Sequence, residues 1–241
     1  MQSKPVTTLP QSSTTSAPSR PVALAADGFA THLRASVVAT LVLLVLVCGL
    51  YPAVVWGLSQ ALFNHKANGS LVYSADGKSV VGSELLSQPF AGEKYFQPRP
   101  SAAGSGHDPS SSGGTNLGPT SDKLLNGVAD DPATKDVNES YDGVKQLAEA
   151  YRKTNGLAAD AVVPADSVTR SASGVDPHIS PANAKLQTAR VARARGISEA
   201  DVAKLIDGNT QSPQFGLLGD AGVNVLMLNR ALDAAGPGPG R

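Results

Sequence analysis

Hydrophobic positions concentrate in one long run near the N-terminus. From Ala35 to Phe63 the chain carries no Asp, Glu, Lys, Arg or His. At ~1.5 Å per residue a helix over this run is roughly 40 Å long, against roughly 30 Å of bilayer hydrocarbon. A buried core helix is shorter and carries a polar face, so the pattern predicts one membrane-spanning helix, with a kink near Pro52. Ser59-Gln60-Ala61 looks like a signal-peptide cleavage site, but the run exceeds the ~7–15 apolar residues of a signal peptide, which favours an uncleaved anchor.

The segments around this run differ in composition, and they predict four parts. Residues 1–26 form a disordered Ser/Thr/Pro-rich tail, 27–64 the anchor, 65–235 one soluble domain and 236–241 a flexible C-terminus. The positive charges on the two sides of the anchor are nearly balanced. A short leading tail and a long following domain favour a single-pass protein of the cell membrane, with a cytoplasmic N-terminus and an extracytoplasmic domain.

Within the soluble domain, strand and helix patterns follow one another without regular alternation. Asp76-Gly77, between two short apolar runs, indicates a β-hairpin. Helical periodicity predicts helices over Asp136–Lys153, Pro181–Arg195 and Ser198–Asp207, and Val223–Leu228 indicates a buried strand leading into a last helix. We therefore expect an α+β domain, with residues 97–121 as loop.

Composition removes several classes of function. Lys+Arg and Asp+Glu both total 20, so the chain lacks the basic charge of a nucleic-acid-binding protein. A single cysteine and four scattered histidines predict no disulfide and no metal site.

A Ser/Gly-rich turn is the first candidate site. It contains Ser112, Gly113, Gly114, Asn116 and Gly118. Successive backbone N–H groups in such a turn could hold a phosphate. No Gly-Lys-Ser/Thr follows, so the turn is not a P-loop, and a purely structural loop is the favoured interpretation.

A second candidate brings Asp176, His178 and Ser180 into one short segment. A hydrolytic triad needs these groups to converge from separate elements. Ser180 before Pro181 is instead typical of a helix N-cap followed by proline at the first helical position. We therefore expect Ser180 to cap the helix, Asp176 and His178 to hydrogen-bond locally, and no residue to be catalytic.

Two further groups of polar residues accompany the predicted helices. Arg190 and Arg195 belong to a basic set on the 181–195 helix, which indicates either a solvated face or a docking face for an acidic partner. Asn224 and Asn229 flank an apolar run, and we expect them to hydrogen-bond the backbone.

Several long motifs in a fixed order resemble one family, the C subunits of Kdp-type potassium-transporting ATPases. The matching segments are Gly82–Leu86, Tyr95-Phe96, Arg99-Pro100-Ser101 through Gly104, Ser112–Pro119, Val163–Thr169, Ser171–Pro181, Arg190–Ala192 with Ala194–Gly196, Gly216–Gly219, and Val223–Leu226 with Leu228-Asn229. The resemblance covers roughly residues 34–233. The N-terminal tail and residues 126–160 match poorly.

The resemblance implies a non-catalytic accessory subunit of an ATP-driven potassium pump. Its partners would be a channel-like potassium-binding subunit, a P-type ATPase subunit and the lipid bilayer. It would stabilise the complex and raise its apparent ATP affinity, with no cofactor of its own. The Asp-Lys-Thr-Gly-Thr motif of a phosphorylated pump subunit is absent. An extracytoplasmic domain cannot meet cytoplasmic ATP, so the effect on ATP would act through conformational coupling. A membrane-anchored hydrolase and an anion-binding protein remain the alternatives.

The anchor itself carries a candidate interface. Gly49, Ala53 and Gly57 recur every four residues and so share one helix face. Helices in lipid associate through such small-residue faces. Glycine is also simply common in membrane helices, so a plain tether is the alternative.

Overall fold

The computed structural model describes residues 28–129 and 140–236. The predicted N-terminal tail, residues 237–241 and the start of the predicted 136–153 helix lie outside the described residues. The chain divides into two units after Leu58.

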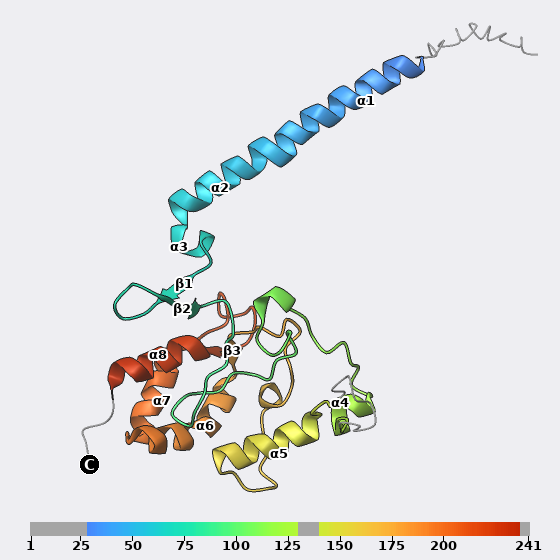
Figure 1. Cartoon of the computed structure of the whole chain (residues 1–241). Helices are drawn as coiled ribbons and strands as arrows, with labels where there is room; N and C mark the ends of the chain where they lie inside the picture. The colour runs from blue at the N-terminus through green and yellow to red at the C-terminus, as the bar shows by residue number, and fades with distance from the viewer. Residues whose placement is uncertain (1–27, 130–139, 237–241) are drawn as a thin grey trace, which may run out of the picture. The chain divides into compact units, whose positions relative to one another are not determined.

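One uninterrupted helix of 34 residues runs from Phe29 to Leu62. It comprises α1 (Phe29–Leu43), η1 (Leu44–Leu50) and α2 (Tyr51–Leu62). The helix is long and apolar enough to cross a membrane, as predicted (Figure 1). The segment η1 is a π-helix, in which the Tyr51 N–H donates to the Leu46 carbonyl. Pro52 follows Tyr51 directly. Proline has no backbone N–H and its ring crowds the preceding helical turn, and the wider π-helical turn accommodates both effects.

The second unit mixes short strands and helices, so the predicted α+β class is confirmed. In chain order its elements are α3 (Asn64–Ala67), β1 (Leu71–Tyr73), β2 (Val80–Ser83), η2 (Pro109–Ser111), α4 (Asp122–Asn126), α5 (Val144–Asn155), η3 (Ala165–Ser167), β3 (His178–Ile179), α6 (Pro181–Arg195), α7 (Glu199–Gly208), β4 (Thr210–Gln211), β5 (Gly222–Asn224) and α8 (Val225–Ala235). The predicted hairpin is present as the antiparallel pair β1–β2, and Gly77 supplies the positive φ of its turn.

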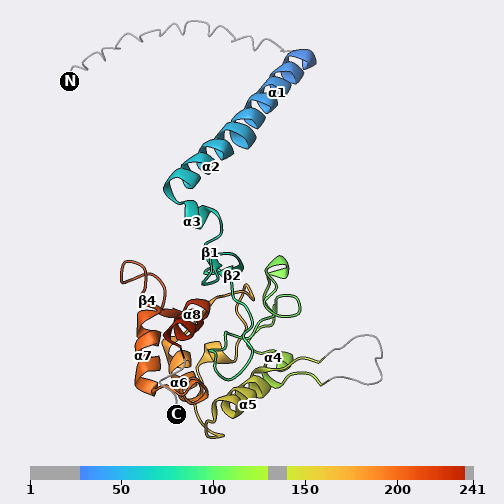
Figure 2. The same ribbon diagram turned by 60° about the vertical axis from the view of Figure 1, so that its left-hand side comes forward.

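A second, three-stranded antiparallel sheet has the order β3-β5-β4. Val223 of the central strand is paired with Ile179 on one side and Thr210 on the other. This sheet joins the start of α6, the end of α7 and the start of α8, three helices that pack together, with α5 against α6 (Figures 1 and 2).

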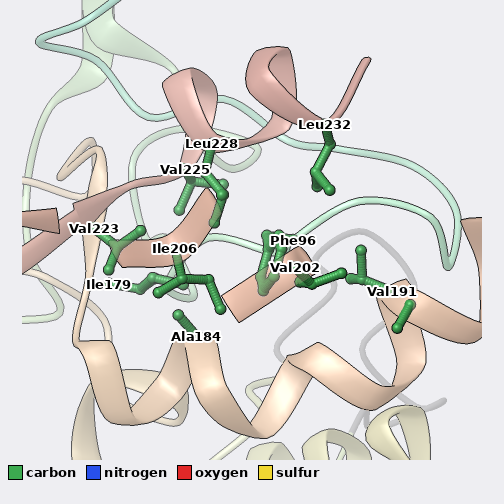
Figure 3. Close-up of a cluster of buried hydrophobic side chains, with 11 residues drawn as sticks. Phe96, Ile179, Ala184, Val191, Val202, Ile206, Val223, Val225, Leu228 and Leu232 are labelled. Atoms are coloured by element: carbon green, nitrogen blue, oxygen red, sulfur yellow. The ribbon is translucent and has the colours of Figure 1, made fainter. Parts of the chain in front are cut away.

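The hydrophobic core lies between α6, α7 and α8. Phe96, on an irregular segment, is fully buried between residues of α6 such as Ala184 and residues of α8 such as Leu228 (Figure 3). Val202 and Ile206 of α7 complete the cluster.

Two of the predicted boundaries are wrong. The helix predicted from Asp136 begins at Val144, because Tyr141 forms a β-bridge with Val128 and Gly143 takes the N-cap position. The apolar run from Val223 is strand only as far as Asn224, whose side chain caps α8 from the next residue onward.

Candidate functional site

Three of the candidate residues, Asn229, Arg190 and Arg195, hold an irregular strap, residues 93–97, that crosses between α6 and α8. On α8, the Asn229 amide bonds both main-chain groups of Phe96: the Phe96 N–H donates to Oδ1 (2.8 Å) and Nδ2 donates to the Phe96 carbonyl (3.0 Å). On α6, Gln187 does the same for Gln97, at 2.8 and 3.1 Å. Side-chain amides thus replace the neighbouring strands that a sheet would supply, which satisfies the buried backbone of the strap.

Arg190 holds the same strap from inside the domain. The residue is 1% exposed, and its guanidinium donates to the carbonyls of Glu93 (2.5 Å) and Tyr95 (2.9 Å), to Gln187 Oε1 (2.7 Å) and to Asn155 Oδ1 (3.0 Å). Burial lowers the pKa of Arg190 from its ordinary value. The prediction that Arg190 belongs to a solvated or docking face is therefore wrong, because its guanidinium is buried and donates to uncharged oxygen atoms inside the fold.

Arg195 closes the end of the strap. Its Nε donates to the Lys94 carbonyl (2.7 Å), its Nη2 pairs with Asp233 Oδ1 (2.8 Å), and its guanidinium lies 5.0 Å from the centroid of the Tyr95 ring. Although it sits in the last turn of α6, this side chain also serves the fold.

The Asp176 segment is stabilised by local contacts and one ion pair. Asp176 accepts from the His178 backbone N–H (3.0 Å) and pairs with Arg99 (2.8 Å). Burial on its own would raise the pKa of Asp176, but the hydrogen bonds from His178 and Arg99 and the Arg99 charge outweigh it and lower the pKa to about 2. Next to Arg99 and Pro100, the Ser101 hydroxyl donates to the Gly174 carbonyl (2.6 Å) and so ties the two segments together.

Ser180 caps α6, as predicted. Its Oγ accepts from the Asn183 N–H (3.1 Å) and donates to Asp166 Oδ1 (2.8 Å), and Pro181 occupies the first turn. The serine hydroxyl is therefore engaged with Asp166 rather than with His178, and the triad geometry is not formed.

These segments line a cavity of about 460 Å³, whose walls include Arg99, Asp176, His178, Gln214 and Leu218. Within the described residues, two buried side-chain nitrogens here, Arg99 Nε and His178 Nε2, have no hydrogen-bond partner. Residues 28–129 and 140–236 contain no group of three or more His, Cys, Asp or Glu side chains that could hold a metal ion.

The Ser/Gly-rich turn docks onto the loop that precedes Asp176. The Ser112 hydroxyl and the Gly113 N–H both donate to the Ser173 carbonyl, each at 2.9 Å. A Cβ on Gly114 would lie 3.0 Å from the Ala172 carbonyl oxygen, so glycine permits this close approach. Asn116 has a positive φ of 54°, and Gly118 lies in the exposed end of the turn. The Ser112 hydroxyl and one backbone N–H of the turn, that of Gly113, are thus used inside the fold.

Asn224 has the backbone role expected of it. Its Oδ1 accepts from the Met227 N–H (3.1 Å) as the N-cap of α8, and its Nδ2 donates to the Glu84 carbonyl (2.8 Å). It therefore joins the β1–β2 hairpin to the last helix.

Sequence reasoning missed Asp166, Asn183 and Gln187 as members of this polar network. Asn183, Gln187 and Arg190 follow one another at i, i+4 and i+7, so one face of α6 carries a polar stripe that could have been recognised. No local pattern marks Asp166, which acts on Ser180 from 14 residues away.

Comparison with known proteins defines the class. The family model described as K+-transporting ATPase, c chain matches residues 33–234. The chain is 48% identical over 208 residues to the potassium-transporting ATPase KdpC subunit of Caulobacter vibrioides, covering 86% of this chain and 95% of the relative. It is 46% identical over 209 residues to the KdpC subunit of Koribacter versatilis, covering 86% and 97%, and 48% identical over 183 residues to that of Mycobacterium tuberculosis, covering 76% and 87%.

These matches define a subunit of an ion-transporting ATPase complex. The chain belongs to the KdpC family.

Proposed function

We propose that this chain is a non-catalytic accessory subunit that assembles and stabilises an ATP-driven potassium pump. Its partners are a channel-like potassium-binding subunit and a P-type ATPase subunit. The observation that carries the proposal is the family match over residues 33–234, which takes in the apolar helix as well as the folded domain. The geometry agrees with a non-catalytic role, since Asp176, Ser180 and Arg190 are all engaged in holding the domain together.

The domain lies outside the cytoplasm, with the N-terminus inside and the apolar helix as a single membrane anchor. From that side it acts as a catalytic chaperone: it raises the apparent ATP affinity of the ATPase subunit through conformational coupling, without binding nucleotide itself. The hydrogen bonds from Ser112 and Gly113 to the Ser173 carbonyl support a role without nucleotide binding, because they give the Ser/Gly-rich turn a structural role in the domain.

The test is the ATP dependence of potassium-stimulated ATP hydrolysis, measured on pump preparations with and without this chain. We expect a higher apparent KM for ATP when the chain is removed, and an unchanged KM when Ser112→Ala is introduced into the intact complex. An ATP dependence that ignores the chain contradicts the chaperone role. A KM that shifts with Ser112→Ala favours direct nucleotide contact and contradicts the extracytoplasmic placement.

A further inference from the structure

The loop between β4 and β5 displays large apolar side chains to solvent. This apolar loop, residues 212–219, has Phe215 95% exposed, Leu217 84% and Leu218 59%. Figure 2 shows the chain at β4 projecting away from the body formed by α7 and α8. Single exposed apolar residues are ordinary on protein surfaces, but three within four positions at the tip of one projecting loop mark an interaction site.

The apolar loop is held in this exposed form by its own backbone. Gln214 and Leu218 exchange two main-chain hydrogen bonds, both at 2.9 Å, and the Gly216 N–H donates to the Pro213 carbonyl (2.9 Å). Phe215 adopts a φ of 55°, a left-handed conformation that is unfavourable for a bulky residue and that persists where the surrounding structure enforces it. The loop is thus ordered before any partner arrives, which reduces the entropy lost on binding.

Charge around the apolar loop distinguishes a protein partner from a lipid surface. Between Asn209 and Gly222 the only ionisable residue is Asp220, and it is exposed. The cavity that the loop lines also contains Asp166 and the Arg99–Asp176 ion pair, so carboxylates outnumber the one arginine there. Segments that bind membrane surfaces combine apolar residues with Lys or Arg that attract anionic lipid. A carboxylate beside the tip is repelled by such a surface, whereas it complements a cation at the rim of a protein pocket.

We infer that the apolar loop docks into an apolar pocket, with Lys or Arg at its rim, on another subunit of the pump. The inference rests on the proposed function and deepens it by naming the surface through which the folded domain engages the complex. Phe215 is the central anchor of this contact, because buried aromatic side chains dominate the binding energy of such interfaces. Leu217 and Leu218 flank it, and Asp220 supplies the polar rim.

The direct test places a benzophenone-bearing analogue of phenylalanine at position 215 of the full-length chain. After irradiation of intact cells, the covalent adducts are identified by mass spectrometry. Position 162 is the matched control, since Val162 is 90% exposed in another loop of the domain. We expect adducts with the channel-like or P-type ATPase subunit at 215 and few at 162. Adducts mainly with lipid or with a second copy of this chain, or pump-subunit adducts no more abundant at 215 than at 162, overturn the inference.

A pair of variants separates this inference from the proposed function. Phe215→Ser with Leu217→Ser should lower recovery of the pump subunits with the tagged chain by about tenfold, while thermal unfolding of the chain itself is unchanged. Val162→Ser should lower neither. If the parent chain recovers the pump subunits and the double variant recovers them equally, the docking loop is wrong and the accessory function stands. If the parent chain recovers neither subunit, the proposed function itself fails.

Discussion

Asp176 is the residue whose chemistry the structure specifies most fully. It accepts hydrogen bonds from His178 and Arg99, and its pKa is lowered to about 2. The ordinary value for an aspartate is about 3.9, so folding favours the charged carboxylate. The stabilisation is present at every pH above about 4 and is lost as the pH falls toward 2.

We therefore predict that Asp176→Asn destabilises the domain by on the order of 1–2 kcal/mol at pH 7. The difference between the variant and the parent should shrink as the pH falls from about 4 to 2, because the parent then loses its own carboxylate charge. Thermal unfolding of the full chain in detergent, followed by near-ultraviolet circular dichroism over this pH range, measures it. A difference that stays constant over that range contradicts the ion-pair account.

At the scale of elements, local patterns were predictable and long-range pairings were not. Ser180 before α6 and Ser198 before α7 are recognisable from sequence because each cap acts on a residue three positions ahead. The contact of Asn229 with Phe96 joins residues 133 positions apart, so no local spacing in the sequence predicts it. The burial of Arg190 was missed for the same reason, since its strap acceptors lie more than 90 positions away.

The strap supplies the prediction at this scale. Asn229→Ala leaves the N–H and the carbonyl of Phe96 buried without partners, which should cost about 2–5 kcal/mol of folding free energy. Asn209→Ala is the matched control, because that amide makes one bond, to the Leu205 carbonyl at the end of α7, worth about 1 kcal/mol or less. Chemical unfolding of the full chain in detergent compares the two variants. Equal effects would mean that the strap does not depend on Asn229.

At the scale of the whole molecule, the membrane topology of the chain is open to a labelling experiment. Ser112 is exposed, and Cys48 in η1 is the chain's one thiol. In a chain with Cys48→Ala and Ser112→Cys, we predict labelling by a membrane-impermeant thiol reagent in intact cells. Labelling that appears only after lysis places the domain inside and contradicts the topology.

The apolar helix provides a second prediction at this scale. Within the described residues, a Cβ added at Gly49 or Gly57 meets no atom closer than 4 Å, so a side chain there starts in open space. We predict that Gly49→Leu, Ala53→Leu and Gly57→Leu together preserve membrane insertion but reduce recovery of the complex and potassium-limited growth. Val47→Leu with Val54→Leu, off that face, is the control. Normal assembly by the triple variant would make the helix only a tether.

The central claim is that this chain works as an assembly subunit of a potassium pump rather than on its own. The most direct measurement is purification of the tagged full-length chain from membranes in mild detergent, with identification of the proteins that accompany it. The account predicts that a P-type ATPase subunit and a channel-like potassium-binding subunit are recovered together with the chain, and that potassium-stimulated ATP hydrolysis is recovered with them. Recovery of the chain alone, while those two subunits assemble and transport potassium without it, would contradict the account.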